Sequence, residues 1–264
     1  MSLVFAALSP HPPLLIPNIG KENITKLAET QKALEKLEES LYVSYPDTIL
    51  IISPHGHSFP DVFGINASPT FTTDFARFGD LATTHNFKAD LPFISQITAA
   101  AKRKHFPFVL HLDPGLDYGS SVPLFYLTRH LPKVKIIPVS FSQLDHKTHM
   151  DFGYLLKEEI MKTPERVAVI ASADLSHRLS DKGPGGFSPD GAKFDETVIA
   201  ALKNLNSAAL LNMDPQITAN AAACGLRSIL ILLGILRHVN YDLKILSYEK
   251  PLGVGYLTAE FALK

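Results

Sequence analysis

The sequence has 264 residues, of which 46% are hydrophobic, enough apolar material to bury one large core. Its 25 basic and 26 acidic residues leave a net charge of -1, which excludes the electrostatic footprint of a protein that binds nucleic acid or an anionic membrane surface. The single cysteine, Cys224, excludes an intramolecular disulfide, and the N-terminus lacks a signal-peptide pattern, so we expect a cytoplasmic protein.

Predicted strands and helices alternate along the chain. Strands are expected at residues 3–8, 48–52, 62–66, 108–112, 135–140, 167–172 and 253–261. Helices are expected at residues 18–43, 91–104, 122–130, 146–162 and 194–205, and from Pro215, which follows the N-cap residue Asp214. This alternation predicts an α/β fold with helices layered around a mixed, largely parallel sheet. Because no repeat or linker interrupts the chain, residues 1–264 are expected to form a single domain.

Two helical segments carry further expectations. Residues 229–236 form the longest apolar run near the C-terminus, far shorter than the ~20 residues that span a bilayer, and are expected to form a buried helix. His146 and His149 lie three residues apart on the expected helix 146–162, and we expect both to face solvent rather than to bind a metal.

Three predicted strands end immediately before a segment that contains histidine. The first leads into His11, the second into His55 and His57, and the third into Asp174 and His177. Ligands of open α/β sheets bind beyond the carboxyl ends of strands, and neutral imidazoles from separate strand ends commonly form transition-metal sites. The alternative is that these are loop histidines whose rings bond to backbone or water.

Cys224 is the candidate for a further metal ligand. Gly225 is expected to interrupt the helix that begins at Pro215, and a new helix near Leu226 would direct its dipole at Cys224 and favour the thiolate. The alternative is a buried, small hydrophobic side chain. Asp174 could orient His177 as a general acid or base, or it could cap a helix.

Six short motifs follow one another along nearly the whole chain: residues 9–13, 51–56, 116–124, 171–179, 223–225 and 248–256. In this order they resemble the class III extradiol ring-cleavage dioxygenases, the family of the protocatechuate 4,5-dioxygenase catalytic subunit. The resemblance is strongest to the branch of AmmeMemoRadiSam system protein B and the Memo proteins. It implies a three-layer α/β/α sandwich with a non-haem Fe(II) site.

The resemblance also implies roles for individual residues. His11 and His55 match the two iron-binding histidines of the dioxygenases, with His57 as the alternative to His55. His177 matches the histidine that handles substrate protons, and Asp174 and Tyr118 lie in the matching motifs. The implied partners are a small aromatic substrate of the catechol type and O2.

The sequence departs from the dioxygenase pattern at two positions. Tyr118 replaces a histidine, and a phenol with an ordinary pKa near 10 cannot act as a base near neutrality, although it can donate a hydrogen bond to bound oxygen. Ala223 replaces a glutamate, so the third ligand would be Cys224, as in the Memo-like branch, or a nearby carboxylate such as Glu249. A thiolate would also suit Zn or Cu.

Three functions therefore remain to be compared. The first is O2-dependent cleavage of a catechol-type ring. The second is a Memo-like metal-binding or interaction protein without ring cleavage, and the third is a hydrolase that uses a metal-bound hydroxide. Tyr256 and the C-terminal strand could form the interface of a homo-oligomer, or they could belong to the core.

Overall fold

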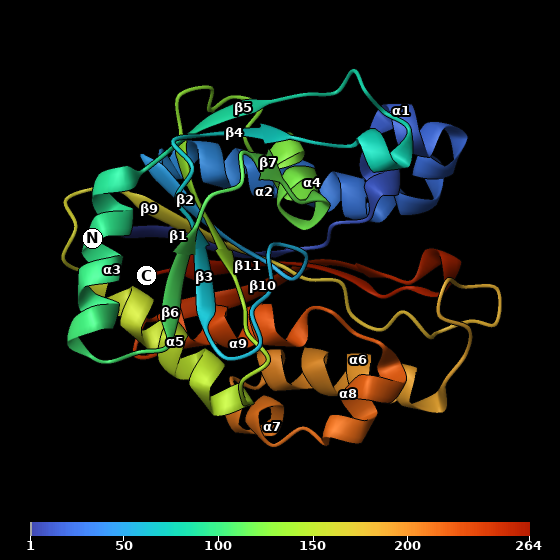
Figure 1. The fold of residues 1–264 in the computed structure, drawn as a ribbon. Helices are drawn as coiled ribbons and strands as arrows, with labels where there is room; N and C mark the ends of the chain where they lie inside the picture. Colours follow the sequence, from blue (N-terminus) through green and yellow to red (C-terminus); the bar gives the residue numbers. More distant parts are fainter. Residues whose placement is uncertain (1) are drawn as a thin grey trace.

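The computed structural model describes residues 2–264, in which eleven strands form one mixed sheet between layers of helices (Figure 1). The strands are β1 Leu3–Ser9, β2 Thr48–Ser53, β3 Phe63–Asn66, β4 Thr70–Thr73, β5 Asn86–Ala89, β6 Phe108–His111, β7 Gly115–Leu116, β8 Lys135–Ser140, β9 Val167–Ser172, β10 Tyr241–Glu249 and β11 Tyr256–Leu263. The helices are α1 Pro17–Gly20, α2 Ala28–Ser44, α3 Leu91–Arg103, α4 Tyr118–Leu127, α5 His146–Ile160, α6 Pro189–Lys203, α7 Ser207–Leu211, α8 Pro215–Ala221 and α9 Leu226–Ile235.

The middle of the sheet is parallel. The strand order is β10-β11-β1-β9-β2-β8-β5-β4-β7, with β3 joined antiparallel to the end of β8 and β6 parallel to β3. The strands β1, β9 and β2 are parallel neighbours, and Ser9 of β1 pairs in register with Ser172 of β9. Their carboxyl ends therefore meet at one edge of the sheet.

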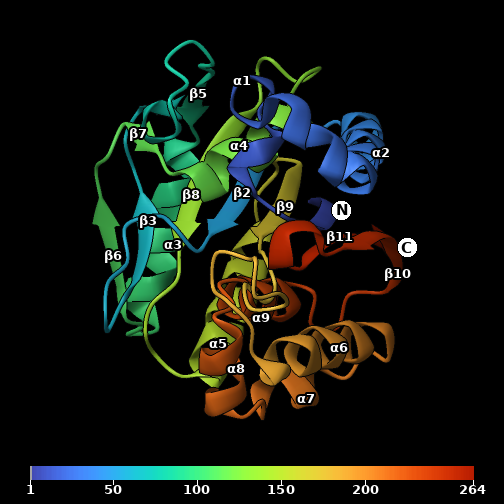
Figure 2. The ribbon, with the colours of Figure 1, turned by 90° about the vertical axis from the view of Figure 1, so that its right-hand side faces the viewer.

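Helices cover both faces of this sheet, which confirms the predicted α/β/α sandwich (Figures 1 and 2). On one face lie α1, α2 and α4, and on the other lie α3, α5 and α9, with α6, α7 and α8 packed outside them. Every residue of β2 and β9 is buried, as expected for central parallel strands covered on two sides. The helices α5 and α9 cross at Gly153 and Gly234, where a Cβ on Gly153 would lie only 2.0 Å from the Ile231 carbonyl oxygen.

Three predicted helices have clearly different bounds in the structure, among them α6, which begins at Pro189 rather than at the expected residue 194. The expected helix 18–43 is divided into α1, a 3-10 segment Lys21–Leu27 and α2. The division occurs because Gly20 packs against the Leu14 carbonyl and Lys21 adopts a positive φ of 47°. The helix α4 begins at Tyr118, before the expected residue 122, because the Asp117 side chain caps it by accepting from the Ser120 N–H.

Further predictions concerned whether particular residues are buried or exposed to solvent. The run 229–236 lies in or next to the buried helix α9, as predicted. The prediction of a solvent-facing His149 is wrong, since its ring is fully buried and contacts the Asp145 and Ser142 carbonyl oxygens. Tyr256 is only 4% exposed and belongs to the core. Among the helices described between residues 2 and 264, none combines the length and hydropathy that a bilayer crossing requires.

Candidate metal centre

His11 follows β1 and is held by two hydrogen bonds. Its backbone N–H donates to Asp174 Oδ1 at 2.9 Å, and its Nδ1 lies 2.8 Å from Ser172 Oγ. The Ser172 hydroxyl donates its own proton to the Gly119 carbonyl oxygen at 2.5 Å, so it accepts from Nδ1–H of His11. This arrangement fixes the tautomer and leaves the Nε2 lone pair of His11 free.

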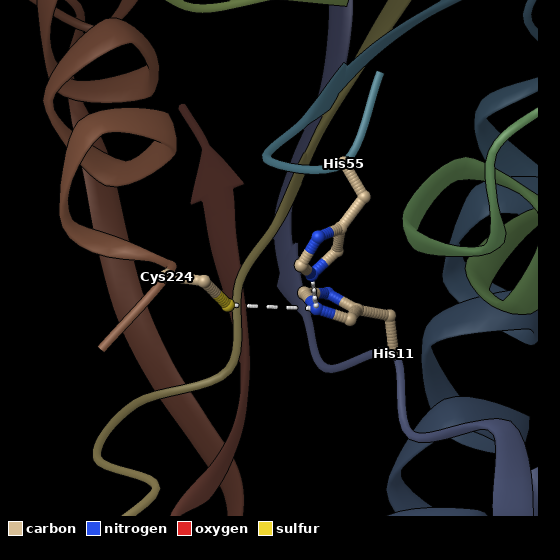
Figure 3. A group of neighbouring side chains, drawn as sticks. All are labelled: His11, His55 and Cys224. Atoms are coloured by element: carbon tan, nitrogen blue, oxygen red, sulfur yellow. Dashed lines mark hydrogen bonds between the residues drawn. The ribbon is translucent and has the colours of Figure 1, made fainter. Parts of the chain in front are cut away.

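His55 follows β2 and directs its ring towards His11. The two Nε2 atoms are 3.1 Å apart (Figure 3). The Tyr118 ring stacks on His55 with centroids 4.3 Å apart, and its hydroxyl lies 2.8 Å from His55 Nε2. Gly119 permits this packing, since a Cβ there would lie 2.5 Å from Ser53 Oγ and 3.1 Å from His55 Cδ2.

Cys224 approaches the two histidines from the junction of α8 and α9 (Figure 3). Its Sγ lies 3.6 Å from His11 Nε2. Gly225 allows this approach, because a Cβ there would lie 2.5 Å from the Cβ of Ala173, and its N–H donates to the Asp174 carbonyl oxygen at 3.0 Å. The new helix predicted near Leu226 is confirmed, since α9 begins there, but the helix from Pro215 already ends at Ala221, where Ala222 adopts a positive φ of 50°.

The three donor atoms have the spacing of a metal site. They all lie within 4.8 Å of one another. In a tetrahedral site with bonds of about 2.1 Å to nitrogen and 2.3 Å to sulfur, two nitrogens are about 3.4 Å apart, and a nitrogen and a sulfur about 3.6 Å apart. The observed distances of 3.1 Å and 3.6 Å are close to these values. Two imidazole lone pairs so close together repel each other unless a cation or a proton lies between them.

Burial controls the ionisation of these donors. It lowers the pKa of His11 well below its ordinary value, with His55 and His177 adding to the shift. It also lowers the pKa of His55 to about 4, with His177 and Arg77 as further causes. Burial raises the pKa of the Cys224 thiol, which overrides the helix-dipole effect expected from the sequence. Without a cation, the site therefore holds two neutral imidazoles and a neutral thiol.

Asp174 contacts His11 rather than His177. Besides accepting from the His11 N–H, its Oδ2 lies 3.5 Å from His11 Nε2, and burial raises its pKa to about 7. The prediction that Asp174 orients His177 is wrong, because His177 Nδ1 instead donates to the Ala222 carbonyl oxygen at 2.9 Å. That bond leaves Nε2 of His177 free as an acceptor.

Two other candidate ligands lie outside this cluster. The His57 ring packs against Phe59 and His111, with centroids 4.6 and 5.4 Å away. The Glu249 carboxylate accepts from the Thr30 N–H at 2.7 Å. The structure thus brings His55 and Cys224 to His11, and it places His57 and Glu249 elsewhere.

A cavity of about 400 Å³ opens beside His55 and Tyr118. Its other lining residues include Arg77, whose guanidinium lies 4.3 Å from the Tyr118 ring centroid, and His111. Neither residue was predicted from the sequence as a site residue. Neither follows one of the three strands that lead into the histidine-containing segments. Burial raises the pKa of Tyr118 to about 12, so its hydroxyl stays protonated and can donate a hydrogen bond.

Comparisons with known proteins place the chain in a family. Residues 5–259 match the model of the catalytic LigB subunit of aromatic ring-opening dioxygenase. Protein CA_C1420 of Clostridium acetobutylicum is 31% identical over 265 residues, which cover 97% of this chain but only 57% of that protein. The chain thus spans little more than half the length of this relative.

More distant relatives extend the comparison. The MEMO1 family protein MJ0403 of Methanocaldococcus jannaschii is 22% identical over 245 residues, which cover 89% of this chain and 72% of that protein. The crystal structure of the uncharacterized protein JW3007 from Escherichia coli K12 shares the fold, with a TM-score of 0.71 at 18% identity over 98% of this chain and 100% of that one. This chain therefore belongs to the family of the catalytic LigB subunit of aromatic ring-opening dioxygenases, the class III extradiol family, and its likeness to a MEMO1 family protein supports the Memo-like branch.

Proposed function

We propose that this chain is a metal-dependent oxygenase that opens the ring of a catechol-type aromatic substrate with O2. The observation that carries the proposal is the cluster of His11, His55 and Cys224 beside a cavity large enough for a single aromatic ring. Family membership supports the same reaction class. In this proposal residues 1–264 act as one extradiol-dioxygenase-like domain, and the single cysteine favours a cytoplasmic location.

The metal would be held by Nε2 of His11, Nε2 of His55 and Sγ of Cys224. Fe(II) is the metal that the family relationship favours, and the thiolate would also suit Zn or Cu(I). When bound, the metal supplies a Lewis acid for the two substrate hydroxyl groups and, in the case of Fe(II), the electrons through which O2 reacts. In ring opening, the carbon–carbon bond beside the two hydroxyl groups breaks and both atoms of O2 enter the product.

His177 would accept a proton from the substrate. Burial lowers its pKa, so the ring is neutral near pH 7, and its Nε2 carries the free lone pair. Tyr118 would instead donate a hydrogen bond, because its pKa of about 12 keeps the phenol protonated. Asp174 would act on the metal ligand His11, whose backbone it holds.

Oxygen uptake tests this function directly. Protein purified without O2 and loaded with Fe(II) would be mixed with a panel of catechols, and O2 consumption would be followed after air is admitted. We expect uptake with at least one catechol and a rate about 100-fold lower in His177→Ala. The same change at His130, whose side chain is 67% exposed, should leave the rate unchanged. Absence of uptake across the whole panel would rule out ring cleavage.

A Memo-like metal-binding protein without ring cleavage is the second candidate. The thiol of Cys224 in place of a carboxylate ligand favours it, as does a Tyr118 phenol that cannot act as a base. The likeness to MEMO1 family protein MJ0403 gives further support. Tight metal binding without O2 uptake would favour this candidate, whereas Zn-supported hydrolysis without O2 would indicate a metal-dependent hydrolase.

A further inference from the structure

A second cavity, of about 280 Å³, reaches Cys224 between the helices α5, α8 and α9. Its lining includes His146 at the start of α5, Thr218 of α8 and Arg227 of α9. It shares no lining residue with the cavity beside His55 and Tyr118. The two cavities therefore reach the candidate metal centre through different ligands.

Arg227 brings an uncompensated positive charge to this cavity. Its side chain is half-buried, and its Nε is shielded from solvent without any hydrogen-bond partner. The guanidinium carbon lies 5.5 Å from the Phe141 ring centroid. None of the ion pairs found within residues 2–264 involves Arg227. Burying an arginine without a counter-charge costs free energy that a bound anion would recover.

A histidine and a helix N-terminus lie beside Arg227. His146 lines the same cavity, and its Nδ1 faces the Leu211 carbonyl oxygen at 3.4 Å. Burial lowers the pKa of His149 to about 4, and Arg227 and His146 add to this shift, so both lie near its ring. The helix α9 begins beside them without a side-chain cap, so its dipole has the same sign.

We propose that this second cavity binds a small oxyanion, either a phosphate or a carboxylate group. The Arg227 guanidinium would donate two parallel hydrogen bonds to it. The cavity has room for a group of this size but is separate from the proposed substrate cavity. This anion site does not require a bound metal, so the proposal can be tested independently of ring cleavage.

Anion titration of the metal-free full chain tests the proposal, because a metal-free protein cannot bind the anion through its metal. Inorganic phosphate and acetate would be titrated separately and followed by calorimetry. We expect saturable binding of at least one of them at a single site, and affinity weaker by about tenfold or more in Arg227→Gln. Binding of phosphate alone would identify a phosphoryl group as the ligand, and binding of acetate alone a carboxylate.

The matched control is Arg237→Gln, which makes the same charge change at an exposed position beyond the other end of α9. It should stay within about twofold of the wild-type affinity. Arg227→Met, which keeps the packing against Phe141, replaces Arg227→Gln if that variant does not fold. The proposal is overturned if neither anion binds the wild type, or if removal of the Arg227 charge leaves the affinity unchanged.

Discussion

Ser172 decides which nitrogen of His11 is available to a metal. Its hydroxyl donates to the Gly119 carbonyl oxygen and therefore accepts from Nδ1–H of His11, which leaves Nε2 unprotonated towards His55 and Cys224. The His11 ring therefore already has the tautomer of a metal ligand in the absence of a metal. A hydrogen bond of this kind usually contributes strongly to metal affinity, because it holds both the tautomer and the ring orientation.

Replacement of this serine tests its role. We expect Ser172→Ala to weaken metal binding by about 10- to 100-fold, since Nδ1–H loses its acceptor and the ring is no longer held. Competition with a chelator of known affinity measures the change. Ser95→Ala, at an exposed position on α3, is the matched control and should bind as the wild type does. Equal affinities in both variants would contradict the positioning role.

The pKa values predict how metal affinity depends on pH. The pKa of Cys224 is raised and that of His55 is lowered to about 4, so the proton released on metal binding comes from the thiol. Above pH 7, where Asp174 is ionised, the affinity for Zn should rise about tenfold for each pH unit. Competition with a chelator, measured from about pH 7.5 to about pH 9, gives this slope. A flat profile would show that the thiolate is not a ligand.

Some site residues could be predicted from the sequence because strand ends are visible in it. His11 and His55 follow β-branched or apolar strands, and Gly225 marks the break beside Cys224. The choice of His55 over His57 depends on how the chain turns after β2, which no local pattern encodes. The partner of Asp174 depends equally on the pairing of β1 with β9, and the sequence suggested His177 in error.

At the level of secondary structure, the parallel neighbours β1, β9 and β2 bring His11, His55 and Asp174 to one edge. The helix α4 must then approach closely, and Gly119 at its first turn leaves the space for His55. The position of His55 is therefore set by the strand β2 that precedes it and by the helix α4 that packs against it.

An added methyl group tests this close approach. Gly119→Ala should displace His55, since the Cβ would lie 2.5 Å from Ser53 Oγ and 3.1 Å from the ring. We expect a loss of about 1–3 kcal/mol in the free energy of unfolding, together with weaker metal binding. Urea denaturation and metal titration measure the two effects. Gly115→Ala, where the nearest atom to the new Cβ would be 3.4 Å away, should change neither stability nor metal binding. Equal effects in the two variants would contradict the close approach of α4 to His55.

A buried carboxylate on α6 supports the segment that carries His177. Asp195 is 1% exposed, and it accepts from the Ser176 N–H at 2.8 Å and from the Tyr248 hydroxyl at 2.7 Å. Ser176 Oγ and the His177 N–H in turn both donate to the Ala221 carbonyl oxygen, next to the segment that leads to Cys224. Asp195 therefore connects α6, β10 and the site.

Removal of this carboxylate leaves the buried Ser176 N–H and the part-buried Tyr248 hydroxyl without their partner. We expect Asp195→Ala to lower the free energy of unfolding by about 2–4 kcal/mol and Tyr248→Phe, which loses one bond, by about 1 kcal/mol. Urea denaturation gives both values. Glu196→Ala, exposed on the same helix, should stay within about 0.5 kcal/mol of the wild type. A wild-type stability for Asp195→Ala would exclude the supporting role.

Continuous apolar strands were predicted well, whereas elements fixed by tertiary contacts were not, and the nine-residue strand β10 was missed although its burial alternates. The bounds of β8 and β9 agree with the expectation, because each is a continuous apolar run. The short strands β4 and β5 were missed, since each offers only four residues of alternating burial that pair through distant partners. The division of the helix at Gly20 likewise depends on contact with Leu14, which periodicity does not encode.

At the level of the whole molecule, one sheet forms the central layer of the fold, and the candidate site lies at one of its edges. The alternation of strands and helices was sufficient to predict the α/β/α sandwich, because parallel strands require helical crossovers on both faces. Two cavities reach the candidate centre, one through His55 and the other through Cys224. The chain corresponds to 57% of its relative CA_C1420, so the activity of that longer protein is a separate question.

Metal content measured after purification without O2 tests the central claim, the three-residue metal centre. The wild type would be compared with His11→Ala, His55→Ala and Cys224→Ala, and with His57→Ala as the matched control that lies outside the cluster. We predict about one transition-metal ion per chain in the wild type and in His57→Ala, and a loss of most of it in each of the other three variants. Full metal content in His11→Ala and Cys224→Ala, or its loss only in His57→Ala, would contradict the account.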